Sequence, residues 1–200
     1  MEERAQRIVD AAIELAEEGG FQNVRLREVA ERSGVAFGTL YARFNSKEDI
    51  LIAALDQEIT KFRDMIADTP PPGDSATGRV GNLFTVLTGA LLHRKGFAYA
   101  VLRSVASGVP GVAGRIISYQ TTMNNLIVAA ITGRSVAAVE SGDFDEEIFF
   151  AARMMQSIWF AELISWISEI HNEESLISRT LRGCNMILAS LDLAAFDSSP

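Results

Sequence analysis

Residues 33–44, SGVAFGTLYARF, constrain the fold more strongly than any other stretch of the chain. Gly34 can take a left-handed turn conformation without the steric cost of a Cβ atom. Apolar residues at helical spacing lie on both sides of this turn, which predicts a short helix over residues 26–33 and another over 37–44. Two short helices joined by a glycine-containing turn form a helix-turn-helix unit.

The second of these helices has two apolar faces. Leu40 and Phe44 lie four residues apart, and so do Phe37 and Tyr41 on a different face. A unit this small can bury only one of the two faces against its own core. We therefore expect Leu40 and Phe44 to be buried, and Phe37 and Tyr41 to be available to a partner.

The start of this second helix suits a DNA groove. An exposed Phe37 ring can contact a thymine methyl group, and Gly38 lets the backbone approach closely. The Thr39 hydroxyl can hydrogen-bond to a phosphate or to a base edge. In a helix-turn-helix unit these positions are the ones that face base edges.

The charge distribution agrees with this interpretation. The whole chain has a net charge of −8, but residues 25–47 hold five basic side chains and two acidic ones. A local basic patch can hold DNA on an acidic protein, because surface charges act over about 10 Å at ordinary ionic strength. An ordinary solvated face is the alternative explanation.

Helical periodicity continues along the rest of the chain, and no segment alternates with period two for long enough to predict a strand. The sequence therefore predicts an all-α fold of about nine helices. Proline and glycine in residues 67–78 predict a loop between two parts of the chain. The predicted helices cover residues 3–18, 26–33, 37–44, 46–66, 79–93, 97–106, 110–131, 145–170 and 175–191.

Two of these helices carry more detailed signals. The first has Ile8, Ala12, Leu15 and Ala16 on one stripe, and Gly19–Gly20 is expected to end it. Ser46 is the expected N-cap of the fourth, with Asp49 three positions later in capping-box style.

The last two predicted helices are apolar around most of their circumference. A helix of this kind must be covered on more than one side. One side can pack on its own domain, and the other can meet a second subunit. A large monomeric core is the alternative.

Other functional classes find little support. A single cysteine, Cys184, excludes an internal disulfide and a multi-cysteine metal site, and we expect its thiol to be buried and inert. His93 and His171 lie far apart, and no phosphate loop, nucleophile elbow or HExxH motif is present, so we expect neither an enzyme nor a bound cofactor or metal. The charged N-terminus and the lack of about 18 consecutive apolar residues predict a cytoplasmic protein without a membrane segment.

Residues 7–55 resemble the DNA-binding domain of TetR-type transcriptional regulators, most specifically in the run G-T-L-Y-x-x-F-x-S-K-E-D. The resemblance implies a helix-turn-helix domain in residues 1–50 and a ligand-binding and dimerisation domain in residues 51–200. It further implies a homodimer, formed through the last two long helices, that binds double-stranded operator DNA. The DNA-contacting positions carried over by this resemblance are Arg25, Arg27, Phe37, Gly38, Thr39, Tyr41, Arg43 and Lys47.

Two of these positions depart from the family pattern. Arg25 stands where many relatives carry a threonine that caps the second helix, and arginine cannot accept the hydrogen bond that a cap must accept. We expect Arg25 to contact phosphate and Asn23 or water to serve the helix end. Arg43 replaces the usual tyrosine or histidine, which keeps a donor and adds a permanent charge.

The resemblance also implies an effector pocket in the middle helices. Within the family, the chain resembles repressors of sterol or lipid catabolism in actinobacteria, which suggests a small hydrophobic effector, either a steroid or an acyl-CoA. Arg103, Asn124 or Arg115 would fix a polar group of the effector, although plain core packing is the alternative for each pocket residue. The candidate lining residues are Phe84, Leu87, Leu91, Tyr99, Leu102, Arg103, Met123, Asn124, Ile127, Met155 and Trp159.

The most consistent interpretation is a repressor that an effector releases from a near-palindromic operator. The alternative is a helical ligand-binding adaptor that keeps the fold but no longer binds DNA. The basic residues Arg27, Arg43 and Lys47 favour the regulator.

Overall fold

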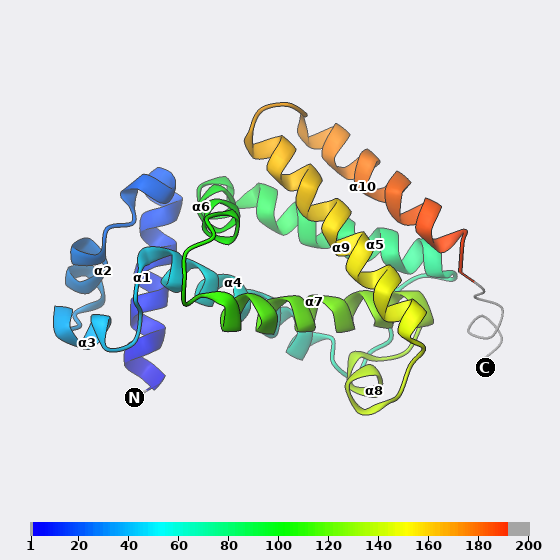
Figure 1. The fold of residues 1–200 in the computed structure, drawn as a ribbon, viewed down its shortest axis with the longest axis horizontal. Helices are drawn as coiled ribbons and strands as arrows, with labels where there is room; N and C mark the ends of the chain where they lie inside the picture. Colours follow the sequence, from blue (N-terminus) through cyan, green and yellow to red (C-terminus); the bar gives the residue numbers. More distant parts are fainter. Residues whose placement is uncertain (1, 192–200) are drawn as a thin grey trace. The chain divides into compact units, whose positions relative to one another are not determined.

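The computed structural model describes residues 2–191, and these residues form ten α-helices and no strand (Figure 1). The predicted all-α fold is confirmed. The helices are α1 (Glu2–Asn23), α2 (Leu26–Ser33), α3 (Phe37–Tyr41), α4 (Lys47–Met65), α5 (Ala76–His93), α6 (Lys95–Ala106), α7 (Ala113–Thr132), α8 (Val136–Ser141), α9 (Glu146–Ile167) and α10 (Glu173–Leu188).

The additional helix is α8, which falls in a stretch that the sequence predicted as loop. Ser135 caps it, because its hydroxyl accepts a hydrogen bond from the Ala138 amide at 3.3 Å. Val136 and Val139 are buried. A single capped turn with two buried valines is too short to produce a recognisable helical period.

Two glycines shape the N-terminal part of the chain. Gly20 has a φ of 65°, so helical geometry breaks at Gly19–Gly20 as predicted, before a last turn leads to Asn23. Gly34 has a φ of 63° and ends α2 in the left-handed conformation that the turn to α3 requires. These two breaks separate the three helices of the predicted helix-turn-helix domain.

The described chain divides into two compact units. The first takes the chain up to Ile59 together with Leu91–Tyr119, so it contains α1 to α3, α6 and parts of α4, α5 and α7. The second takes Thr60–Ala90 together with the chain from Gln120 onward. The sequence-based division at residue 50 stays a prediction.

The first unit is built on close packing of α6 against α1 (Figure 1). Ile8, Ala12 and Leu15 of α1 are almost fully buried, which confirms the predicted inner stripe. The two helices are in backbone contact at Gly96, where a Cβ atom would overlap the Ala16 carbonyl oxygen. Only glycine allows this approach.

In the second unit, α9 and α10 run antiparallel and side by side (Figure 1). They are also in close contact, since a Cβ atom at Gly183 would lie 3.0 Å from two carbon atoms of Ile158. Arg79 of α5 is buried and donates to the carbonyl oxygens of Ala130 and Ile131, at 2.9 and 3.0 Å. These hydrogen bonds satisfy the C-terminal end of α7.

Over residues 2–191, no helix is both long and apolar enough to cross a lipid bilayer.

Replacing Gly96 with alanine should lower the free energy of unfolding by about 1 to 3 kcal/mol, because the new methyl group overlaps the α1 backbone. Chemical denaturation measures the change. Gly89→Ala is the matched control: Gly89 lies on the exposed side of α5, and a Cβ atom added there would have nothing within 4 Å. This control should be neutral or stabilising by up to about 1 kcal/mol. Equal stability of the two variants would contradict the packing described.

Candidate functional site: a nucleic-acid interface and an effector core

The first turn of α2 has no side-chain cap. Arg25 occupies the N-cap position without a capping hydrogen bond and instead pairs with Glu28 at 3.2 Å. The sequence suggested Asn23 or water for this helix end. In the described part of the chain, Asn23 forms no hydrogen bond to α2, and its side-chain amide donates instead to the Leu15 carbonyl oxygen at 3.2 Å. The first N–H groups of α2 are therefore left to solvent or to an anion.

The two faces of α3 separate as predicted. Leu40 is fully buried and Phe44 is 3% exposed, whereas Phe37 is 40% and Tyr41 49% exposed. The two exposed rings pack edge to face, with their centroids 4.8 Å apart. Large apolar side chains that lie exposed and packed together on a helix are typical of a surface that meets a partner.

The helix itself is shorter than predicted, because regular helix ends at Tyr41 and the chain then turns. The predicted DNA-contact positions in the first unit are nevertheless open to solvent, with Thr39 partly so. Gly38 has nothing within 4 Å of where its Cβ would be, so its backbone is accessible. The exposed members of the predicted set are Arg25, Arg27, Phe37, Gly38, Tyr41 and Arg43, whereas Thr39 and Lys47 are half-buried.

Lys47 differs from the other predicted contacts because its ammonium group is engaged within the unit. Its Nζ donates to the Phe21 carbonyl oxygen at 3.0 Å and lies 3.7 Å from the centroid of the Phe21 ring. Burial lowers the pKa of Lys47, and the nearby positive charges of Arg103 and Arg25 lower it further. The contact with Phe21 fixes the start of α4 against the end of α1.

A buried carboxylate fixes the loop between α3 and α4. Ser46 caps α4, accepting from the Asp49 amide at 3.1 Å, and Asp49 Oδ2 accepts from the Asn45 amide at 3.0 Å. The Ser46 cap is the one that the sequence predicted, whereas the Asp49 side chain accepts from the amide one residue before the cap. Asp49 Oδ1 accepts from Arg115 Nε at 2.5 Å, and the Arg115 guanidinium lies 5.1 Å from the Phe44 ring centroid.

Sequence reasoning missed this role of Arg115, which it considered only as an effector contact. The pairing joins residues 66 positions apart, so no local pattern could reveal it. The nearest available signal was Asp49 itself, an acidic residue at a capping position directly before an apolar run.

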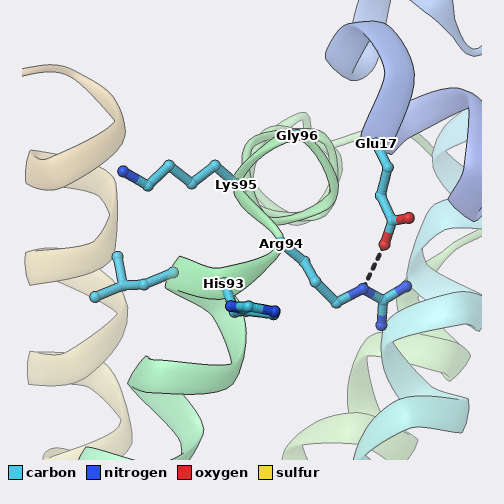
Figure 2. Close-up of a pocket in the computed structure, with 6 residues that line it drawn as sticks. Glu17, His93, Arg94, Lys95 and Gly96 are labelled. Carbon is cyan, nitrogen blue, oxygen red and sulfur yellow. Dashed lines mark hydrogen bonds and ion pairs between the residues drawn. The ribbon is translucent and has the colours of Figure 1, made fainter.

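A hollow of about 620 Å³ lies at the bend between α5 and α6, lined in part by Glu17, His93 and Lys95 (Figure 2). Arg94 extends toward Glu17 in Figure 2 and forms an ion pair with it, while its Nη1 lies 2.9 Å from Glu58 Oε2. Two carboxylates therefore already neutralise this guanidinium. Its role is to join α1, α4 and the start of α6, rather than to receive an anionic ligand.

The predicted effector residues fall in both units. The second unit holds Phe84, Leu87, Met123, Asn124, Ile127, Met155 and Trp159, all of them buried. Phe84 and Trp159 pack with their centroids 5.6 Å apart, and the indole N–H donates to the Thr88 hydroxyl at 2.9 Å. Asn124 Oδ1 is buried without a hydrogen-bond partner among the described residues, which is costly unless a ligand or water supplies a donor.

The other four predicted effector residues, Leu91, Tyr99, Leu102 and Arg103, belong to the first unit. Leu102 is buried in that unit. Arg103 is exposed, and its guanidinium carbon lies 5.0 Å from the Phe21 ring centroid. Arg103 thus stacks on the same ring as Lys47.

Residues 8–54 match the family described as "Bacterial regulatory proteins, tetR family". The chain is 28% identical over 177 residues to the HTH-type transcriptional repressor KstR of Rhodococcus jostii, covering 88% of this chain and 79% of that protein. Residues 8–54 therefore form a domain of the TetR family. KstR of Mycobacterium tuberculosis is 23% identical over 96% of this chain and 84% of its own length.

Solved structures of transcriptional regulators share this fold. A TetR transcriptional regulator from Rhodococcus sp. RHA1 superposes with a TM-score of 0.80 at 27% identity, covering 94% of this chain and 97% of that one. FadR from Bacillus subtilis, solved in complex with stearoyl-CoA, superposes with a TM-score of 0.65 at 18% identity, covering 93% and 98%. The named relatives are regulators rather than enzymes.

Replacing Asp49 with asparagine should lower the free energy of unfolding by about 1 to 3 kcal/mol, because Arg115 loses its partner and one acceptor is exchanged for a donor. Thermal and denaturant unfolding measure the loss. Asp10→Asn is a control on the exposed side of α1 and should change stability by less than about 0.5 kcal/mol. Equal effects of the two substitutions would show that the Asp49 carboxylate has no special role.

Cys184 is fully buried, and burial raises the pKa of its thiol to about 12. The native protein should therefore react with a thiol reagent such as Ellman's reagent only slowly at pH 8, and rapidly after unfolding. Because the folded pKa lies above the unfolded value of about 8.5, this thiol also favours the folded state less as the pH rises past that value. Rapid reaction of the native protein would contradict the burial of Cys184.

Proposed function

We propose that this TetR-family protein is a transcriptional repressor that binds a near-palindromic operator as a homodimer and is released by a small hydrophobic effector. The observation that supports this most directly is the exposed Phe37–Tyr41 pair on α3, held outward by the buried Leu40 and Phe44. We propose repression rather than activation because the KstR relatives are named as transcriptional repressors. Residues 1–50 form the DNA-binding part in this proposal, and residues 51–200 the ligand-binding and dimerisation part.

The DNA contacts divide into two kinds. Phe37 and Tyr41 offer apolar ring surface to thymine methyl groups, and Thr39 and Tyr41 offer hydroxyl groups to bases or phosphates. Arg25, Arg27 and Arg43 supply exposed guanidinium groups for backbone phosphates. The uncapped first turn of α2 offers additional N–H donors beside Arg25.

A homodimer through α9 and α10 would cover apolar surface that the second unit leaves open. Phe150 and Met154 on α9 are 60% and 37% exposed, and Met186 on α10 is 70% exposed. A two-fold axis through such an interface would present two α3 helices to half-sites about 34 Å apart, which requires an operator with matching symmetry.

The effector proposed for the second unit is apolar with at least one polar group. Buried aromatic and aliphatic side chains offer the apolar environment, and the unpaired Asn124 Oδ1 offers an acceptor. KstR relatives and a FadR structure with bound stearoyl-CoA point to a steroid or an acyl-CoA. A thermal-shift screen against steroids, fatty acids and their CoA esters tests this proposal.

Release of DNA would be a shift between two conformations. The helices α4 and α7 each begin in the first unit and end in the second, so each runs as one continuous helix from one unit into the other. An effector can release DNA only if it binds one conformation more tightly than the other. The adaptor alternative shares the effector site but predicts no DNA binding at all.

Replacing Tyr41 with alanine should weaken binding to a duplex selected by the wild-type protein about 10- to 100-fold, because an exposed ring and hydroxyl are lost from α3. Fluorescence anisotropy measures the affinity, and sedimentation should show an unchanged oligomeric state. Tyr41→Phe should retain most of the affinity. Loss of dimerisation in Tyr41→Ala would contradict the assignment of α3 to DNA binding.

Replacing Met186 with glutamate should dissociate the homodimer, because a charge would be buried in the proposed apolar interface. Sedimentation velocity at several protein concentrations measures the dissociation. Val86→Glu is the matched control, because Val86 is another exposed apolar side chain of the same unit, 54% exposed, but lies on α5. A dimer that survives Met186→Glu and dissociates with Val86→Glu would place the interface elsewhere.

A further inference from the structure

We propose that Arg103 of α6 contacts the DNA backbone together with Arg25 and Lys47, so that the DNA-binding surface extends beyond the helix-turn-helix segment. The proposal rests on the proposed DNA-binding function and deepens it. It assigns to DNA phosphates a residue that the sequence suggested as an effector contact.

Phe21 organises this cluster, because two cations share its ring. Lys47 Nζ lies 3.7 Å from the ring centroid and the Arg103 guanidinium carbon lies 5.0 Å from it. One cation over an aromatic ring is favourable. A second cation on the same ring adds like-charge repulsion, which an anion brought to the cluster would relieve.

Within the described residues, the cluster has little internal neutralisation. Arg103 forms no ion pair there, and its side chain contacts the Phe21 ring instead. Arg25 pairs with Glu28, but its side chain is 72% exposed. The negative charge of Glu48 raises the pKa of Lys47, whereas the positive charges of Arg103 and Arg25 lower it.

The chemistry of the three side chains suits a phosphate. A guanidinium held over a ring keeps N–H donors at its edge, where a phosphate oxygen can accept them. Lys47 donates one N–H to the Phe21 carbonyl oxygen and retains two more. Arg25 and Lys47 lie at the starts of α2 and α4, so Arg103 adds a third cation from α6, far along the chain.

Binding to a mixed-sequence 30-base-pair duplex at several salt concentrations tests the proposal, since phosphate contacts do not depend on sequence. Each phosphate contact contributes about 0.9 to the slope of log affinity against log salt. Arg103→Gln should reduce this slope by about 0.9 and weaken binding several-fold at low salt. Arg103→Lys keeps the charge and should keep the wild-type slope.

Arg134→Gln is the matched control, because Arg134 is also exposed and stacks on a phenylalanine ring, 5.1 Å from the centroid of Phe144, in the second unit. It removes the same charge and should leave the slope unchanged. An unchanged slope in Arg103→Gln, or an equal fall in Arg134→Gln, would overturn the assignment of Arg103. Absence of duplex binding by the wild-type protein would instead overturn the proposed function itself.

Discussion

The buried carboxylate of Asp49 is the contact on which the geometry of the proposed DNA-binding surface depends. One oxygen accepts from the Asn45 amide in the loop after α3, and the other accepts from Arg115 of α7. The Arg115 guanidinium also covers the Phe44 ring, which anchors α3. The position of the exposed Phe37–Tyr41 pair is therefore set by a side chain outside the helix-turn-helix segment.

Other contacts also connect the first helices to residues outside the helix-turn-helix segment. Arg94 pairs with Glu17 of α1 and Glu58 of α4, and Gly96 permits backbone contact between α6 and α1. These contacts join α6 and the start of α7 to α1 to α4 in one compact unit. The helices α4 and α7 continue into the second unit. A movement of either helix there can therefore be transmitted to Asp49 and Arg115, which lie on the same two helices in the first unit.

Local patterns predicted much of this arrangement. Four-residue spacing separated Leu40 and Phe44 from Phe37 and Tyr41, because a helix buries one stripe regardless of its partners. Capping chemistry predicted the start of α4 at Ser46 and Asp49. Long-range pairs were not predictable: the contacts of Arg115 with Asp49 and of Arg103 with Phe21 join side chains that only the folded chain brings together. The short helix α8 was missed because one capped turn has no period to detect.

The proposed function depends above all on two copies of α3 binding a symmetric DNA site. Selection of bound duplexes from a random pool by the wild-type protein, followed by sequencing, tests this most directly. We expect enrichment of an inverted repeat whose half-sites are separated by about one turn of DNA or a small multiple of it. A pool without any enriched sequence, from a protein that still responds to an acyl-CoA or a steroid in a thermal-shift assay, would contradict this function and identify the chain as a ligand-binding adaptor.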